Sequence, residues 1–419
     1  MIGLDGTRYS LITRLMDEGR MPHFAALVRQ GYIQPLNSVY PTVSSVAWST
    51  YMTGANPARH CIFGFLDRKL GSYQTFIPTA SHRRAPTLWE KLSEVGRRVI
   101  VMNVPVTFPP RPVNGILISG FLSPSLEKAT YPPSISRKLA AMGYRLDVDP
   151  WSARESKEKL PEDFRLTLAG RTEAMFHFMD SEPWDFFRCH VMETDRLHHF
   201  PWEDMTNGDP KYAPAFYDCY TQIDEVLGQV ARRLDDRTTL IVLSDHGFCT
   251  LKWEVQVNYW LIEKGWLSFE KTPPQSLADI SPHARAFSLI PGRLYINLQG
   301  REPKGSVARR DYERVHEELA AAAVEMRDPE TGAPMIEKVL RREDTYEGPH
   351  LEEAADLILV PHRGYDLKAR LHSDTFVSKG ALVGMHTYDD AFLFLNDPSF
   401  SKYVDSVQDL FPVIMERLA

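Results

Sequence analysis

Four clusters of acids and histidines stand out in this sequence because each lies at a turn or at the end of an apolar run. They share the side chains that bind divalent cations, and they are Asp5, the pair Asp195 and His199, the pair Asp245 and His246, and His386. Together they supply three carboxylates and three imidazoles, a mixture of hard and borderline ligands that suits zinc or manganese. The sequence therefore predicts a metal centre assembled from distant segments.

Ser44 could complete such a centre, since it lies where a loop turns into an expected helix within residues 41–54. A serine hydroxyl is almost never ionised at neutral pH, but a divalent cation lowers the pKa of a coordinated oxygen, from about 16 to about 7 for water on zinc. Backbone N–H groups at the helix start would add donors for a negatively charged group. We expect Ser44 to be a nucleophile; the simpler alternative is that Ser44 or Ser45 caps the helix.

The other clusters also have simpler explanations when each is taken alone. Asp5 could be a turn residue, and Asp245 could belong to an Asx turn after its strand. Of two adjacent histidines, His199 is favoured as the ligand because it lies four residues after Asp195, and His198 is expected behind it or in the pocket wall. Other histidines are interpreted as surface or core residues without a role: His60, His190, His362 and His372.

The elements expected around these residues alternate between strands and helices. Strands are predicted at 1–5, 98–103, 115–120, 185–192, 239–244, 356–360 and 391–395. Helices are predicted at 9–18, 22–30, 86–95, 165–180, 212–234, 309–326 and 404–417. This alternation is typical of a mostly parallel sheet covered on both faces, with ligands at the carboxyl ends of the strands. The first strand is short, so a start upstream of Met1 is left open.

Two segments interrupt that pattern and are predicted to be insertions. Residues 122–182 carry charged helices and scattered prolines and are interpreted as a cap, and residues 258–347 are interpreted as a second insertion or subdomain. We expect substrate specificity to lie there. Aromatic side chains that could stack on a base or sugar, although packing is the simpler role, are Phe63, Phe121, Trp151 and Trp202.

The composition narrows the classes of function. Of the 419 residues, 43% are hydrophobic and 25% are charged, as in ordinary globular proteins. No apolar run is long enough to span a membrane, and the N-terminus does not resemble a signal peptide. Four cysteines without paired spacing favour a reducing compartment, and we expect a cytoplasmic protein. With a net charge of -7, the chain lacks the excess of positive charge typical of proteins that bind duplex nucleic acid, although a nucleotide-sized substrate is not excluded. The oligomeric state is left open.

The stretch from Pro41 to Gly54 resembles the nucleophile motif of type I phosphodiesterases and nucleotide pyrophosphatases, which belong to the alkaline phosphatase superfamily. Residues 54–64 resemble the continuation of that motif, with Cys61 in place of the usual glycine. The Asp-Gly after the first strand, Asp-x-x-x-His, Ser-Asp-His-Gly and a late Gly-x-His then follow in the family's order. The resemblance covers nearly the whole chain.

The resemblance implies an alkaline-phosphatase-like αβα sandwich, with residues 1–419 forming one catalytic domain with the two insertions. It implies two divalent ions, zinc being the first expectation and manganese the second. One ion would be bound by Asp5, Ser44, Asp245 and His246. The other would be bound by Asp195, His199 and His386.

The implied reaction is hydrolysis of phosphodiester or phosphoanhydride bonds through a phosphoserine, with retention of configuration at phosphorus. Asn103, shared with a prokaryotic branch of the family, and Ser45 are candidate substrate contacts. Animal-type members carry an asparagine three residues after the nucleophile, where this chain has Ala47. Alternatives are therefore a phosphomonoesterase, a phosphonate hydrolase or a phosphomutase on the same core, or a binding protein that has lost catalysis. A sulfatase is disfavoured because Pro and Arg do not follow Ser44 as its motif requires.

Overall fold

The apolar runs form an eight-stranded sheet in the computed structural model of the chain, which describes residues 1–149, 154–397, 399 and 404–419. The strand order is β2-β19-β9-β1-β8-β5-β6-β7. Five adjacent strands from β9 to β6 are parallel, and antiparallel strands flank them on both sides. Their bounds are β1 Ile2–Leu4, β2 Tyr32–Leu36, β5 Val99–Val104, β6 Gly115–Ser119, β7 Thr130–Tyr131, β8 Phe186–Val191, β9 Ile241–Leu243 and β19 Ala391–Leu395. The expected mostly parallel sheet is confirmed.

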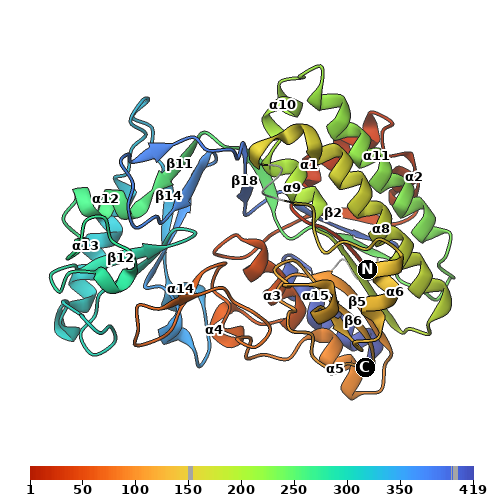
Figure 1. Cartoon of the computed structure of the whole chain (residues 1–419), viewed down its shortest axis with the longest axis horizontal. Helices are drawn as coiled ribbons and strands as arrows, with labels where there is room; N and C mark the ends of the chain where they lie inside the picture. Colours follow the sequence, from red (N-terminus) through yellow and green to blue (C-terminus); the bar gives the residue numbers. More distant parts are fainter. Residues whose placement is uncertain (150–153, 398, 400–403) are drawn as a thin grey trace. The chain divides into compact units, whose positions relative to one another are not determined.

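Helices cover both faces of this sheet because successive side chains of a strand point to opposite sides. On β5, Ile100 and Met102 face one helical layer, whereas Val99 and Val101 face the other. The first layer contains α1 Tyr9–Asp17, α2 Pro22–Val28, α8 Leu160–Ser181 and α11 Tyr212–Ala231; the second contains α3 Ser44–Thr53, α5 Leu88–Glu94 and α15 Leu410–Leu418. Figure 1 shows both layers, and the predicted αβα sandwich is confirmed.

The chain divides into two compact units, each described by itself. The first comprises residues 1–55, 79–250 and 381–419, and the second comprises 56–78 and 251–380. The expected cap at 122–182 falls in the first unit, where Phe164 and Phe178 of α8 are buried in a helical layer of the sandwich. Its role as a cap stays a prediction, and Trp151 lies outside the described residues.

The second unit contains its own sheet, with the order β12-β13-β15-β14, and a three-stranded sheet, β16-β11-β17. Its elements include β11 Trp253–Gln256, β12 Ala286–Leu289, β13 Arg293–Ile296, β14 Ile336–Arg341, β15 Leu357–Pro361, β16 Tyr365–Lys368, β17 Val377–Ser378, α12 Val257–Glu263 and α13 Tyr312–Val324. The expectation that residues 356–360 return to the main sheet is wrong, because β15 pairs with β13 and β14. A short apolar run has the same appearance in any buried sheet, so its composition could not decide between them.

A short antiparallel ladder in the first unit joins two segments that are far apart in the sequence. β10 (Gly247–Thr250) pairs with β18 (Gly384–Thr387), and Phe248 lies opposite His386. A Cβ atom at Gly384 would lie 2.3 Å from the carbonyl oxygen of His198, so the chain needs glycine at this close approach. None of the helices in the described ranges is both long and apolar enough to cross a membrane.

Candidate active site

Three neighbouring parallel strands bring the predicted acids together. Asp5 follows β1, Asp245 lies two residues after the end of β9, and Asp195 lies in α9 (Glu193–His199), just after β8. β1 pairs with both β8 and β9, so the carboxyl ends of all three strands meet at one edge of the sheet. All three acids are buried there.

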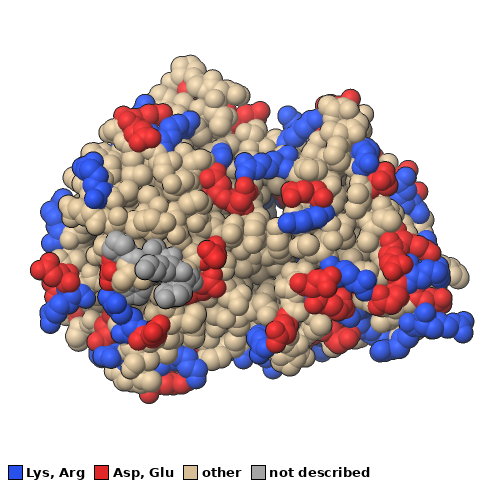
Figure 2. All heavy atoms as spheres, turned by 180° about the vertical axis from the view of Figure 1, so that it is seen from behind, with Lys and Arg blue, Asp and Glu red and all other residues tan. Residues whose placement is uncertain are grey.

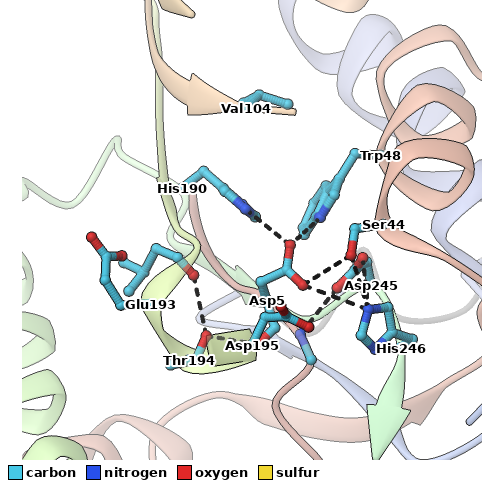
Figure 3. A network of polar contacts seen from close by, with 12 residues as sticks. Asp5, Ser44, Trp48, Val104, His190, Glu193, Thr194, Asp195, Asp245 and His246 are labelled. Carbon is cyan, nitrogen blue, oxygen red and sulfur yellow. Dashed lines mark hydrogen bonds and ion pairs between the residues drawn. The ribbon is translucent and has the colours of Figure 1, made fainter. Parts of the chain in front are cut away.

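Ser44 is the first residue of α3, and its side chain points at these acids (Figure 3). Its Oγ donates to Asp5 Oδ1 at 3.2 Å and lies 3.1 Å from His246 Nε2. The N-cap position belongs to Val43, and no side chain caps the helix, so neither Ser44 nor Ser45 has the simple capping role. The Ser44 hydroxyl is therefore directed into the acid and histidine cluster.

Side chains from all four sequence clusters converge in two overlapping groups. In one group, ligand atoms of Asp5, Asp245 and His246 lie within 4.8 Å of one another; in the other, those of Asp195, His246 and His386 do so. His199 Nε2 lies 3.4 Å from Asp195 Oδ1 and 3.1 Å from His386 Nε2. The seven predicted site residues are thus brought together, and His246 lies between the groups: Asp5, Ser44, Asp195, His199, Asp245, His246 and His386.

Two backbone carbonyls fix the orientation of two of the imidazoles. A carbonyl oxygen can only accept, so His199 Nδ1 donates to Gly384 O at 2.9 Å and His246 Nδ1 donates to Gly247 O at 3.0 Å. In the neutral rings, both Nε2 atoms then carry the lone pair and face the carboxylates. This arrangement of an outer carbonyl and an inner nitrogen is typical of metal-binding histidines, so the donor set fits a pair of divalent cations.

The carboxylates differ in their electrostatic surroundings. Burial, followed by repulsion from Asp245 and Asp195, raises the pKa of Asp5 well above its usual range. Burial also raises the pKa of Asp245 to about 8. Burial alone would raise the pKa of Asp195 as well, but His199 and His386 hold it well below its usual range. Divalent cations among these groups would favour the ionised form of all three acids.

Trp48 and His190 belong to this network, and the sequence analysis missed both. Trp48 Nε1 donates to Asp5 Oδ2 at 2.8 Å, and His190 Nε2 lies 3.1 Å from the same oxygen (Figure 3). Oδ2 is thereby held away from Ser44, which contacts Oδ1. His190 is buried, as the expectation of a surface or core histidine allowed, but its contact with Asp5 was not predicted. The sequence did contain one sign of this contact. Arg188 and His190 are two polar residues on one face of an otherwise apolar strand, just before Asp195.

His198 points away from the cluster. Its Nδ1 donates to Gly6 O at 2.9 Å, and its Nε2 accepts from the hydroxyl of Tyr220 at 2.7 Å. Burial lowers the pKa of His198 to about 3, so the ring stays neutral. These contacts agree with the choice of His199 over His198 as the residue that faces the acids.

The two proposed substrate contacts have buried polar atoms without hydrogen-bond partners. Asn103 lies near the carboxyl end of β5 with a φ of 66°, and neither polar atom of its side chain is paired. Ser45 Oγ is likewise buried and unpaired. Trp202 is instead a packing residue, since it is buried and its Nε1 donates to Thr250 Oγ1. Phe63 is also buried, in the second unit.

Comparisons with known proteins agree with the fold. The sequence pattern described as type I phosphodiesterase / nucleotide pyrophosphatase matches residues 1–389. A phosphonoacetate hydrolase from Sinorhizobium meliloti 1021, solved with phosphonoformate, is 17% identical with a TM-score of 0.67, covering 99% of this chain and 94% of that one. No curated protein matches the sequence.

Two mammalian structures are also similar. Murine ectonucleotide pyrophosphatase / phosphodiesterase 5 is 15% identical with a TM-score of 0.59, and the match covers all of this chain and 94% of that one. The human protein of the same name is 16% identical with a TM-score of 0.56, and the match covers all of this chain and 93% of that one. An inactive variant of the murine protein was solved with AMP.

Proposed function

The chain belongs to the type I phosphodiesterase / nucleotide pyrophosphatase family, and from this premise we propose that it is a two-metal hydrolase of phosphodiester or phosphoanhydride bonds. The observation that carries the proposal is the position of Ser44. Its hydroxyl lies at the start of a buried helix, within 3.2 Å of Asp5 and His246, and does not cap that helix.

The metal ligands we propose are those expected from the sequence. Asp5, Ser44, Asp245 and His246 would hold one ion, and Asp195, His199 and His386 would hold the other. Zinc suits this mixture of carboxylates and imidazoles best, and manganese is the alternative. When bound, such ions stabilise negative charge on the attacking and leaving oxygens of an in-line displacement.

In the proposed reaction, Ser44 attacks the phosphorus atom. The Ser44 Oγ–H proton leaves towards Asp5 Oδ1, to which Oγ already donates, because His246 Nε2 would be occupied by the metal. A bond forms between Oγ and phosphorus while the bond to the leaving oxygen breaks, which gives a phosphoserine. Attack by water then breaks the Oγ–phosphorus bond and restores the serine. Two inversions give net retention of configuration at phosphorus.

A phosphonate hydrolase is the second candidate function. Ala47 supplies no polar side chain where animal-type members carry asparagine, so the phosphoryl oxygens need another donor. Ser45 and Asn103 are our candidates, because their buried polar atoms lack partners in the structure. Of the neighbours reported above, the phosphonoacetate hydrolase also has the higher TM-score, 0.67 against 0.59 for the murine protein.

The partner we propose is a small phosphate ester, nucleotide or phosphonate. On the face in Figure 2, the described Lys and Arg side chains lie among Asp and Glu side chains, a mixture that offers little to a duplex nucleic acid. The four cysteines form no disulfide in the structure, in agreement with the proposed cytoplasmic location.

The test is an assay of metal-loaded protein with chromogenic phosphate diesters and monoesters and with phosphonoacetate. Ser44→Ala should abolish turnover of the preferred class while retaining bound metal. Ser49→Ala is the matched control, since Ser49 lies in the same helix and its buried hydroxyl is unpaired. Comparable activity in wild type and Ser44→Ala would remove the nucleophile assignment, and a metal-loaded wild type that cleaves none of these substrates would contradict the hydrolase proposal.

A further inference from the structure

A second kind of ligand cluster lies in the second unit. Cys61, His350 and Glu353 offer a thiol sulfur, an imidazole nitrogen and a carboxylate oxygen, all within 4.8 Å of one another. None of the three belongs to the proposed active site. We propose that they form a third metal site, which binds Zn²⁺ through one sulfur, one nitrogen and one oxygen ligand.

Local structure places the three side chains. Cys61 ends the short helix α4 (Pro57–His60), and Glu353 ends the 3₁₀ turn η5 (Leu351–Glu353). The spacing of three residues puts His350 and Glu353 on one side of that turn, where His350 Nδ1 lies 3.0 Å from Glu353 Oε1. The two halves of the site thus come from segments almost 300 residues apart.

The two segments are fastened together independently of any ion. The backbone N–H of His350 donates to Ala58 O at 3.0 Å, and Asn56 Nδ2 donates to Glu347 O at 2.8 Å. A Cβ atom at Gly348 would lie only 2.6 Å from Ala58 O, so glycine allows this close approach. The ligand atoms are therefore held near one another before binding, which reduces the entropy that binding must overcome.

The donor set and its exposure suit zinc. Thiolate and imidazole are preferred zinc ligands, and a carboxylate commonly accompanies them. Cys61 is 6% exposed, whereas the side chains of His350 and Glu353 are 30% and 33% exposed, so water can reach a fourth position. Tetrahedral zinc holds its ligand atoms about 3.3–3.8 Å apart, as its bond lengths of about 2.0–2.3 Å require, so rotations of the partly exposed His350 and Glu353 side chains suffice to close the site.

The backbone at Cys61 supports a role for the thiol. Its φ of 62° lies in the left-handed region, which favours glycine and costs other residues roughly 1 kcal/mol or more. Glycine is also the residue that the family resemblance predicts at this position. A cation bound to the sulfur of Cys61 would explain why a cysteine, and not glycine, occupies this strained position.

Cobalt provides a direct test, because Co²⁺ bound by a thiolate gives a near-ultraviolet charge-transfer band. None of the proposed active-site ligands is a cysteine, so such a band reports on a separate site. Full-length protein loaded with Co²⁺ should show the band, and Zn²⁺ should displace it. Metal analysis should find one zinc ion per chain more in wild type than in Cys61→Gly.

Cys61→Gly is the decisive variant, because glycine adopts the left-handed backbone without strain and the protein should fold normally. It should lose the band, and His350→Gln should weaken cobalt binding at least tenfold. Cys219→Ala, which removes another buried cysteine, should keep the band. A wild type without the band, or a band that survives in Cys61→Gly, would overturn the proposed site.

Discussion

Two buried clusters of charge, one in each unit, differ in how their acids are balanced. Asp5 and Asp245 in the first unit lie beside each other and beside Asp195. Asp356 in the second unit accepts two hydrogen bonds from Arg301, at 2.7 and 2.6 Å, one from Tyr312 at 2.8 Å and one from the N–H of Ile296 at 2.7 Å. All four acids are buried.

The pKa shifts run in opposite directions as a result. Burial would raise the pKa of Asp356, but Arg301 and Arg342 lower it below its usual value. At Asp245, burial prevails and the pKa rises to about 8, while Oδ2 has no hydrogen-bond partner. A buried carboxylate by itself therefore does not indicate a functional site. A group of buried acids that has too few arginine or lysine partners does indicate one, because its negative charge can be balanced by cations from solution.

The largest expected effect separates the clusters by activity. Ser44→Ala should lower kcat/KM by on the order of 10³-fold or more, because the proposed nucleophile is lost. Asp356→Asn should change kcat/KM of the folded protein less than tenfold, since Asp356 is held in an ion pair with Arg301 inside the second unit. Steady-state kinetics with the preferred substrate class measure both variants. A large kinetic loss in Asp356→Asn with normal metal content would break the distinction.

For stability, we expect a loss at Asp356 and no loss at Asp245 of the first unit. Asp356→Asn should lower the free energy of unfolding by about 3 kcal/mol, because it breaks a buried ion pair and leaves Arg301 uncompensated. Asp245→Asn should leave the metal-free protein as stable as wild type or more so, since it removes a crowded charge. Urea unfolding in the presence of a chelator compares them. A similar loss in both variants would show that the acids at the sheet edge are balanced without metal.

Of the two charge clusters, metal removal should affect only the one that contains Asp5, Asp195 and Asp245. Ions at about 100 times their dissociation constant stabilise the folded state by about 2.7 kcal/mol per site, so EDTA should lower Tm. In Asp195→Asn the Tm difference between metal-loaded and metal-free protein should shrink, and in Ser49→Ala it should stay at the wild-type value. Calorimetry with and without EDTA measures these differences. An unchanged difference in Asp195→Asn would argue against Asp195 as a ligand.

The smallest expected effect is the pH dependence of the metal-free protein. The folded pKa of Asp245 is raised to about 8, so its contribution to stability is present below about pH 4 and is lost as pH rises towards 8. Asp356 has a lowered pKa, so its contribution is present above about pH 4 and is lost in acid. Asp245→Asn should therefore lessen the fall in stability between pH 5 and 8. An unchanged slope in that variant would contradict the raised pKa.

Sequence reasoning anticipated that these acids and histidines come together, because such residues are rare at the ends of apolar strands; their roles as metal ligands and nucleophile stay predictions. It missed His190, since a histidine inside a strand has no distinctive spacing and its partner Asp5 lies 185 positions away. It also assigned residues 356–360 to the wrong sheet, because strand pairing depends on tertiary contacts rather than on the apolar run itself. The Cys61 cluster was not predicted. Its two segments are brought together by a backbone hydrogen bond and by the close approach that Gly348 allows, and neither leaves a sequence pattern.

The ladder between β10 and β18 has a consequence for modularity. Thr250 lies opposite Gly384, so the chain leaves the first unit and returns to it at neighbouring points. A segment of any length can be exchanged between two such points without disturbing the ladder, much as a hairpin loop can be lengthened. Residues 251–380 can therefore differ in length while the ladder keeps His386 against His246, so variation in this part of the second unit need not displace the proposed ligands.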